Sequence, residues 1–291
     1  MKRREFLLTT AMALAAIASG NLPLLAQIKE QAKEKNSVKQ KVPRRIRNIF
    51  TQPPAIEPIT GYLPSFSMVE DADFNSGNYE LTYKAILWTG VDSEINKSTN
   101  REGGSLALRR RQEGDRSIYT VDQKRQHGRR INHLNAEIIC SDSNDYLMEW
   151  NIYSSFSEAR TGDKVPELDF SEKGRIQGNA IRLSAGHKDA EFQTKKPVFS
   201  QWNMTGLLAK RVFHRMPIEF DMMHELSVFK PDQTLRYGGE VQIPFATGDV
   251  SLHCYVQTGY GILPTHYLVD HMGRVQLITQ SMLSWALQKA T

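Results

Sequence analysis

The stretch YELTYKAIL, residues 79–87, alternates apolar and polar side chains with a period of two. Tyr79, Leu81 and Tyr83 would share one face, whereas Glu80 and Thr82 would point to the other, since successive side chains of a strand lie on opposite sides. The stretch therefore predicts a half-buried β-strand. It decides the fold because the same alternation recurs along most of the following chain.

Eleven further stretches carry strand-like patterns, and short polar turns such as Gly103-Gly104 and Met272-Gly273 separate them. The predicted strands are Leu106–Arg110, Ser117–Lys124, Leu134–Cys140, Tyr146–Phe156, Arg175–Ser184, Glu191–Thr194, Glu219–Phe229, Gln233–Ile243, Asp249–Gln257, Thr265–Asp270 and Arg274–Met282. Spacing of about ten residues with no repeating βα unit predicts a mainly β protein. We expect a curved antiparallel sheet, folded as an open barrel or a sandwich.

One packed helix is predicted over Ser200–Met216. Met204, Leu208, Val212 and Met216 recur every four residues and would share one face. Ser200 can cap the start and Pro217 ends the helix. We expect the helix to cover one side of the sheet.

Composition and charge bound the class of protein. The 291 residues are 40% hydrophobic, with 37 Lys and Arg against 32 Asp and Glu, which excludes a fully disordered chain. Residues 1–50 contain eleven cations and three anions, so they carry +8 and the other residues carry −3. The basic character therefore belongs to the N-terminal region.

The N-terminus has a charged region followed by a short apolar run, as in a secretory signal peptide. Arg3 and Arg4 followed by Phe6 and Leu7 resemble the twin-arginine (Tat) export signal. This resemblance implies the Tat translocase as a partner, export after folding, and a periplasmic or cell-envelope location. An ordinary Sec signal is the alternative.

The chain divides into three expected parts. Residues 1–26 form the signal, with cleavage after Ala26 or, alternatively, after residues 16–18. Residues 27–70 read as a basic and then proline-rich disordered linker, because lysines recur without an apolar stripe and five prolines follow. Residues 71–291 form a single β-rich domain.

The two cysteines lie on apolar strand faces. Cys140 follows Ala136 and Ile138 at spacing two, and Cys254 follows Leu252. Because an exported protein meets an oxidising compartment, a disulfide between Cys140 and Cys254 is one prediction. Two separate buried thiols are the alternative.

Candidate catalytic and metal-binding groups are sparse. His253, His266 and His271 are weak candidates for a three-histidine metal cluster, and surface histidines are the alternative. Asp221 with Glu225 or Glu219 could form a carboxylate pair of the kind glycosidases use. The nucleophile-elbow, dinucleotide and P-loop motifs are absent, so no cofactor is predicted.

Residues 101–130 hold nine cations against four anions. On neighbouring strands they would form a positive stripe suited to lipid headgroups or an anionic envelope polymer, and export argues against nucleic acid. The alternative is that these cations pair with acidic residues of the same chain.

The C-terminal stretch from Gly259 to Leu277 has an Asp/Gly turn between alternating segments. It resembles the closing hairpins of the lipoprotein-carrier type, an open barrel around a helical plug. The resemblance implies a hydrophobic concave face able to hold lipid or another apolar ligand. The chain departs from that group because no lipobox cysteine follows the apolar run.

These observations lead to two functional hypotheses. The first is a non-enzymatic binding, carrier or structural protein of the cell envelope that uses the concave face of its sheet. The second is a polysaccharide-acting hydrolase or lyase on a β-sandwich. A groove beneath the Ser200–Met216 helix would favour the first hypothesis, and facing carboxylates or the three histidines together would favour the second.

Overall fold

The computed structural model describes residues 56–59, 61–70, 77–92, 97–141, 143–186, 188–210, 216–245, 248–280 and 282–291. The predicted export signal with Arg3, Arg4, Phe6 and Leu7 lies outside these residues, as does the linker up to residue 55.

Strands dominate the described part of the chain. They are β1 (Tyr79–Asp92), β2 (Lys97–Glu113), β3 (Arg116–His127), β4 (Arg130–Ser141), β5 (Leu147–Glu158), β6 (Phe170–Gln177), β7 (Ala180–Ala185), β8 (Lys188–Gln193), β9 (Val198–Phe199), β10 (Ile218–His224), β11 (Val228–Phe245), β12 (Gly248–Gly259), β13 (Thr265–Val269), β14 (Val275–Thr279) and β15 (Leu283–Ala290). Three short 3-10 helices are η1 (Glu57–Ile59), η2 (Leu63–Ser65) and η3 (Pro166–Leu168), and the α-helix is α3 (Met204–Lys210).

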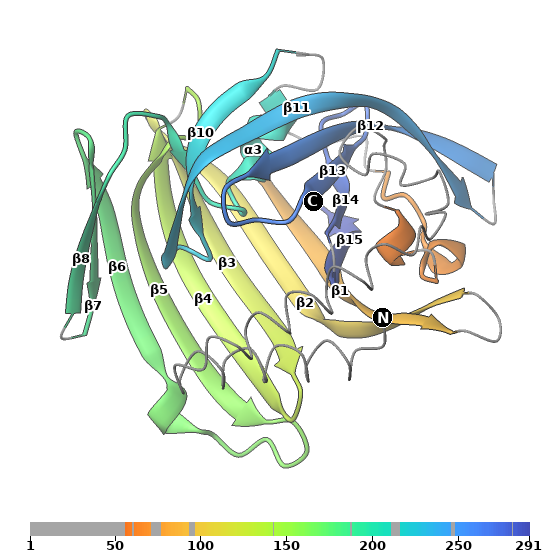
Figure 1. Ribbon diagram of the computed structural model, residues 1–291, viewed down its shortest axis with the longest axis horizontal. Helices are drawn as coiled ribbons and strands as arrows, with labels where there is room; N and C mark the ends of the chain where they lie inside the picture. Colours follow the sequence, from red (N-terminus) through yellow and green to blue (C-terminus); the bar gives the residue numbers. More distant parts are fainter. Residues whose placement is uncertain are drawn as a thin grey trace, which may run out of the picture. The chain divides into compact units, whose positions relative to one another are not determined.

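All the strands belong to one sheet, in the order β8-β7-β6-β5-β4-β3-β2-β1-β15-β14-β13-β12-β11-β10-β9 (Figure 1). Neighbours are antiparallel except β9 and β10, which pair in parallel. The sheet therefore consists of a first meander, β1–β8, and a second meander, β10–β15, with β9 added in parallel at the edge of the second. They are joined where β1 pairs with β15, with Leu81 opposite Ala290 and Leu87 opposite Leu283. The two edge strands, β8 and β9, follow each other in the chain.

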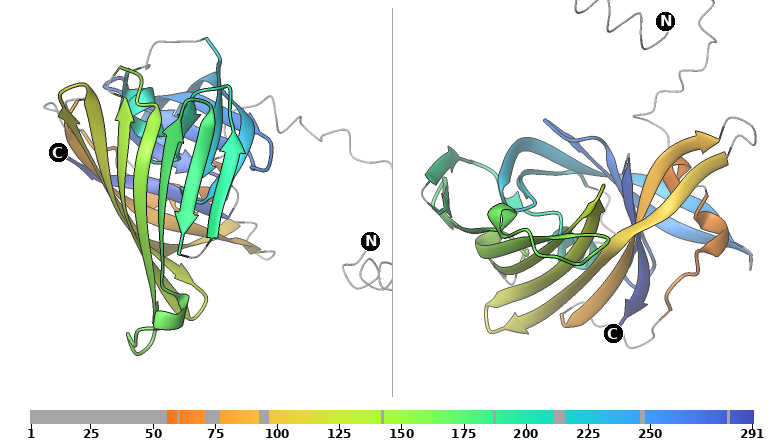
Figure 2. Two further views of the ribbon diagram at one scale, coloured as in Figure 1. Left: turned by 90° about the vertical axis from the view of Figure 1, so that its left-hand side faces the viewer. Right: turned by 90° about the horizontal axis from the view of Figure 1, so that it is seen from below.

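The sheet curves strongly, so that the β2–β6 region faces the β10–β12 region across an interior (Figure 2). We call the face toward this interior the inner face. On β1 it carries Tyr79, Leu81, Tyr83 and Ala85, each at most 4% exposed, as the period-two pattern predicts. The predicted fold class, a curved and open antiparallel sheet with one packed helix, is confirmed.

Helix α3 packs inside the curve against the inner face of the second meander. Met204, Leu207 and Leu208 are buried with Tyr267 and Val275 of β13 and β14. The helix begins at Met204 rather than at Ser200. Of the predicted face, Met204 and Leu208 are buried, Val212 lies outside the described residues, and Met216 is exposed.

The outer face of the second meander is covered by residues 56–70. Ile59, Leu63 and Phe66 are nearly fully buried against outer-face residues of β11–β15, including Leu268 and Leu277. The prediction of a disordered linker is wrong for residues 56–70, because Ile59, Leu63 and Phe66 are buried in a second core on the outer face of the sheet. Pro58 and Pro64, two of the prolines that argued against a helix, lie within the 3-10 helices η1 and η2.

Two predicted strands are hairpins. The stretch 175–184 contains the turn between β6 and β7, and the stretch 219–229 contains the turn between β10 and β11. Strand β15 was not predicted. Within the described residues, no helix has both the length and the apolar character needed to cross a membrane.

Candidate functional site

A cavity of about 380 Å³ lies inside the curve, between β2–β3 and the second meander. It falls within the usual size of small-molecule sites, about 300–1,000 Å³. The lining residues come from both meanders and from the segment before α3: Leu106, Gln123, Arg125, Gln201, Trp202, Met222, His224, Glu225, Lys230, Gln257, Gly261, Ile262, Leu263, Thr265, Tyr267, Ile278, Gln280, Met282, Leu283 and Trp285.

The floor of this cavity is apolar. Leu106 of β2, Trp202 before α3, and Leu283 and Trp285 of β15 are each at most 9% exposed. These side chains are large and rigid, so they offer a preformed surface for an apolar group.

The mouth of the cavity carries exposed apolar side chains. Leu263, in the β12–β13 loop, is 58% exposed and Met282, before β15, is 69% exposed. Tyr260, in the same loop as Leu263, is also exposed. Large apolar side chains that gather in solvent at a cavity commonly mark a binding surface.

One side of the cavity is charged. Arg125 of β3 forms an ion pair with Glu225, in the β10–β11 turn. Lys230 of β11 donates from Nζ to the carbonyl oxygen of Gly261 at 2.5 Å. Burial lowers the pKa of His224, which favours its neutral form. The wall therefore carries two basic side chains, Arg125 and Lys230, and one carboxylate, Glu225.

The β10–β11 turn reaches the opposite meander through an unusual backbone. Glu225 and Leu226 both have positive φ values, of 50° and 59°. This conformation is costly for residues with large side chains. It is held by burial of Leu226 and by the Trp150 Nε1–H, which donates to the Leu226 carbonyl at 2.9 Å. The contact fixes Glu225 beside Arg125.

Buried amides line the polar wall. The Tyr267 hydroxyl donates to Gln257 Oε1 at 2.9 Å, and Gln257 Nε2 donates to Gln233 Oε1 at 3.3 Å. Gln123, on the inner face of β3, is only 3% exposed and makes no side-chain hydrogen bond to any described residue. An unpartnered amide in a cavity wall is available to a ligand.

A buried ion pair anchors α3 and the segment that carries Trp202. Asp145 Oδ1 accepts from Arg110 Nε and Nη2 at 3.2 and 3.0 Å and from the Tyr119 hydroxyl at 2.8 Å. Lys210, at the end of α3, lies 2.8 Å from Asp145 Oδ2. Asn203, just before the helix, donates to the Asp145 carbonyl at 2.7 Å. These contacts hold the helix inside the curve.

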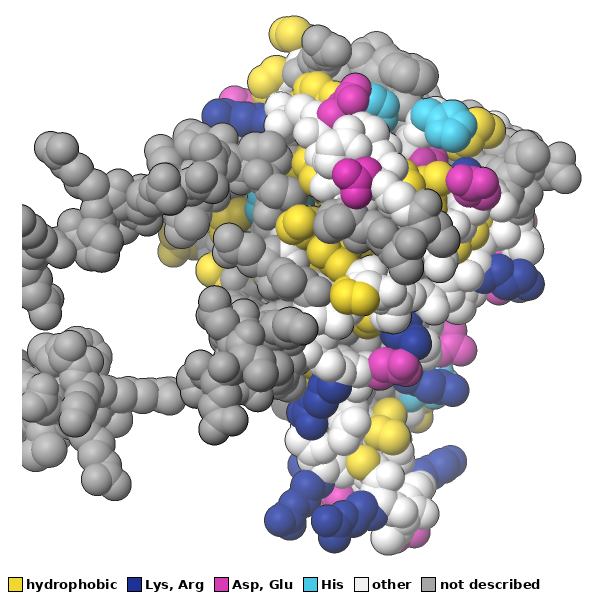
Figure 3. Space-filling view, turned by 90° about the vertical axis from the view of Figure 1, so that its right-hand side faces the viewer, with side chains coloured by type: hydrophobic (Ala, Val, Ile, Leu, Met, Phe, Trp, Pro, Cys, Tyr) yellow, Lys and Arg dark blue, Asp and Glu magenta, His cyan; other side chains and the backbone are white. Residues whose placement is uncertain are grey.

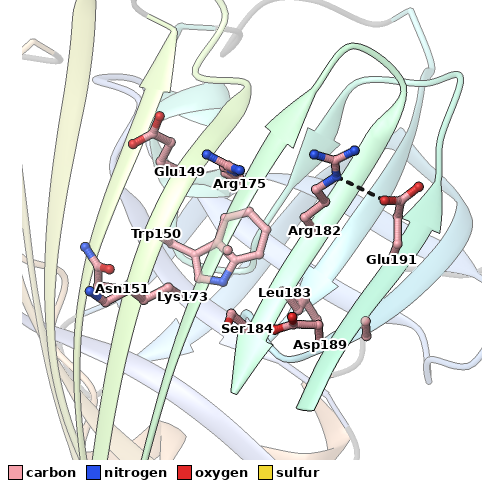
Figure 4. Close-up of a pocket in the computed structure, with 12 residues that line it drawn as sticks. Glu149, Trp150, Asn151, Lys173, Arg175, Arg182, Leu183, Ser184, Asp189 and Glu191 are labelled. Atoms are coloured by element: carbon pink, nitrogen blue, oxygen red, sulfur yellow. Dashed lines mark hydrogen bonds and ion pairs between the residues drawn. The ribbon is translucent and has the colours of Figure 1, made fainter. Parts of the chain in front are cut away.

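A larger hollow, of about 730 Å³, lies on the outer face of β5–β8 (Figure 4). Its charged side chains have both signs, and Arg182 pairs with Glu191 at 3.0 Å. Trp150 and Leu183 are buried toward the inner side, so they offer little apolar surface here. The hollow is a concave part of the sheet surface with a solvated lining of mixed charge. The inner cavity is therefore the better candidate for a ligand-binding site.

The two cysteines do not meet. Both are free and buried. Cys140 lies in the inner core on β4, whereas Cys254 lies on the outer face of β12 under residues 56–70. Because the sheet separates them, the predicted Cys140–Cys254 disulfide is wrong and the alternative of two buried thiols describes the structure. Burial raises the pKa of Cys140 well above its ordinary range and that of Cys254 to about 12.

The three histidines are not brought together. His253 faces inward beside Tyr237, whose hydroxyl lies 3.2 Å from His253 Nδ1. His266 is buried opposite Val256 on the outer face, and His271 is exposed in the β13–β14 turn. The proposed cluster is wrong because the alternation of β12 and β13 sends His253 and His266 to opposite faces. Among the described residues, no group of three or more His, Cys, Asp or Glu is placed to hold a metal ion.

The carboxylates suggested as a pair have separate partners. Asp221 is buried and accepts hydrogen bonds from the Thr194 hydroxyl at 2.6 Å and the Asp232 amide at 2.9 Å. Glu225 pairs with Arg125. Neither carboxylate faces the other across a cleft.

The cations of residues 101–130 are mostly paired within the chain. Six have carboxylate partners: Arg109–Glu80, Arg110–Asp145, Arg111–Glu113, Arg116–Asp115, Arg125–Glu225 and Arg130–Glu158. They are also split between the two faces, since Arg110 is buried inside and Arg109 is exposed outside. In Figure 3, Lys and Arg side chains are concentrated at the lower end of the view, and most of the Asp and Glu side chains lie higher up, near other Lys and Arg side chains.

No family model and no curated protein matches this chain. Among solved structures, the chain is similar to a β-barrel-like protein of domain of unknown function DUF1849 from Brucella abortus. The TM-score is 0.50 at 6% sequence identity, over 75% of this chain and 98% of that one. At this identity the likeness shows the fold alone, a β-barrel-like curved sheet.

Sequence reasoning predicted the faces of the strands and an apolar concave face, but it did not find the residues that line the cavity. Its lining is drawn from segments up to about 180 residues apart, from Leu106 to Trp285, and no local motif marks them. The one usable signal was the apolar pair Ile262-Leu263 within a Gly/Pro-containing turn, where a solvated loop would be polar.

Proposed function

We propose that this protein is an exported, non-enzymatic binding protein of the cell envelope, which holds an amphiphilic small molecule in the inner cavity. The observation that carries the proposal is the combination of a buried apolar floor with an exposed apolar mouth in one cavity. Helix α3, buried inside the curve, supports the carrier hypothesis as its plug.

Physical chemistry supports an apolar ligand at this position. Burying apolar surface stabilises a complex by roughly 25 cal/mol per Å². The floor is preformed, so little ordering is needed to bind. Leu263 and Met282 would cover the part of a ligand that projects from the cavity.

The proposal is tested with protein recovered from the envelope fraction. Native mass spectrometry should detect a co-purifying amphiphile. After its removal, the protein should bind N-phenyl-1-naphthylamine, an apolar fluorescent probe, with one-to-one stoichiometry. Absence of both the co-purifying molecule and probe binding would refute the proposal.

A matched pair of variants locates the site. Leu263→Ser with Met282→Ser should weaken probe binding several-fold without unfolding the protein, because both side chains are more than half exposed. Val228→Ser is the control, since Val228 is 51% exposed and does not line the cavity. Equal binding by both variants would place the probe elsewhere.

The export route is a separate part of the proposal and rests on Arg3 and Arg4 followed by Phe6 and Leu7. Arg3→Lys with Arg4→Lys should leave the protein in the cytoplasm, as a fractionation and immunoblot would show. Normal export of this double variant would exclude the Tat route.

A further inference from the structure

The charged wall of the inner cavity has a net positive charge. Arg125 and Lys230 contribute two cations, and Glu225 contributes one carboxylate. This local excess is independent of the basic N-terminal region, because Arg125 and Lys230 lie on β3 and β11 of a body that is acidic beyond residue 50.

Lys230 is a cation without a carboxylate partner among the described residues. Its Nζ donates to the Gly261 carbonyl, which belongs to the loop at the cavity mouth. An ammonium group has three N–H donors, so this contact leaves donors for a ligand. The contact also fixes Lys230 at the edge of the apolar mouth.

Gln123 supplies a second, independent observation. It is 3% exposed, lines the cavity and makes no side-chain hydrogen bond to any described residue. An amide that makes no hydrogen bond within the protein can donate to and accept from a ligand in the cavity. Gln123 and Arg125 lie two residues apart on the inner face of β3, so their polar groups serve one region of the cavity.

From these contacts we propose that the ligand is an amphiphile with one anionic head, a carboxylate or a phosphate ester, bound by Lys230 and Arg125. The Gln123 amide donates to the same head, and the apolar chain lies on Leu106, Trp202 and Trp285. This inference rests on the proposed function and specifies the chemistry of its ligand.

Glu225 shows how such a head would be held. Its carboxylate forms an ion pair with the guanidinium of Arg125. A guanidinium binds carboxylate and phosphate oxygens through parallel N–H donors. The ligand head and Glu225 therefore compete for Arg125, and removing the Glu225 charge should favour the ligand.

The test compares three amphiphiles of one chain length on delipidated protein from the envelope fraction: dodecanoate, dodecyl phosphate and dodecyltrimethylammonium. Affinity is measured by displacement of N-phenyl-1-naphthylamine at low ionic strength, below the critical micelle concentration of each compound. We expect at least one anion to bind about tenfold or more tightly than the cation, as one charge-assisted contact predicts. The two anions distinguish a carboxylate from a phosphate head.

Variants assign the effect to the wall. Lys230→Gln should weaken anion binding about tenfold without weakening binding of the cation, whereas Glu225→Gln should strengthen anion binding. Arg182→Gln is the matched control, because it removes one cation of an exposed ion pair on the outer face. Urea midpoints of all variants establish that each is folded.

The outcomes separate the two proposals. Equal affinity for the three amphiphiles, or an equal loss for all three in Lys230→Gln, would overturn the anionic head and leave the cavity as an amphiphile site. Binding of none of the amphiphiles and no binding of the probe would overturn the proposed function itself.

Discussion

Replacing Asp145 with Asn should be among the most destabilising isosteric changes in this protein. The Asp145–Arg110 pair is fully buried, with both side chains 0% exposed. Asn has nearly the same volume and also tolerates the left-handed backbone of residue 145, where φ is 54°. The substitution therefore removes a charge while keeping the shape.

The expected loss can be worked out from the contacts. Removing one partner of a buried ion pair costs about 3–5 kcal/mol, because the remaining buried charge loses a charge-assisted partner. An Asn oxygen can still accept from Arg110 and Tyr119, and Lys210 is 30% exposed, so water can solvate it. For these two reasons we expect a loss of unfolding free energy at the lower end of that range, about 3 kcal/mol.

The assay is urea unfolding followed by tryptophan fluorescence, which reports on the buried Trp150, Trp202 and Trp285. Urea is preferred to guanidinium because guanidinium is a salt and screens ion pairs. Glu191→Gln is the control, since its exposed pair with Arg182 should contribute less than about 1 kcal/mol.

A loss below about 1 kcal/mol for Asp145→Asn would refute the reasoning, because it would equal that of an exposed pair. A double-mutant cycle with Arg110→Met adds a second criterion. The double variant should lose less stability than the sum of the two single variants, since either single variant already breaks the Arg110–Asp145 pair. Additive losses would show that the two residues do not act as a pair.

Three further predictions follow from buried groups. Cys140 and Cys254 should not react with Ellman's reagent in the folded protein at pH 8, because burial raises the pKa of each thiol. Both thiols should react in urea without reductant. A reaction that occurs only after reduction would show a disulfide. Glu172→Gln should stabilise the protein at about pH 8 and have little effect near pH 4. Burial raises the pKa of Glu172, so ionisation of this carboxyl group costs stability as the pH rises. Thermal midpoints that differ equally from the wild type at both pH values would contradict this prediction. Gly206→Ala should lower the urea midpoint although Ala favours helix by about 1 kcal/mol, because a Cβ there would overlap the Tyr119 hydroxyl; an unchanged or higher midpoint would show that α3 can move outward.

The fold class could be predicted from the sequence because a half-buried strand alternates apolar and polar residues, and this alternation identifies its buried and exposed faces. Alternation alone predicted that Tyr79, Leu81 and Tyr83 share one face of a half-buried strand, and all three are buried on the inner face. Alternation fails where both faces are buried. In β15 the run Leu283–Leu287 is buried on both faces, with Trp285 on the inner face and Ala286 on the outer face. Ser284 is its one polar residue, and the strand was missed.

Turns were missed for a related reason. The β10–β11 turn places Glu225 and Leu226 in a conformation that usually takes Asn and Gly, so composition does not reveal it. Long-range packing of Leu226 and the Trp150 hydrogen bond stabilise the turn. The cavity depends on the same kind of information, since Lys230 and Arg125 come together only through the curvature of the sheet.

The order of strands has a consequence for folding. Within each meander, strands that follow each other in the chain pair as hairpins. The residues that pair are therefore close in the sequence. The β1–β15 junction instead joins residues about 200 positions apart, such as Leu81 and Ala290. Contacts of such high sequence separation form slowly, because closing a long loop costs entropy before any pairing is gained. The inner cavity takes its floor from β2 on one side of this junction and from β15 on the other. The ability to bind a ligand should therefore appear only with the last and slowest kinetic phase, after most of the secondary structure has formed.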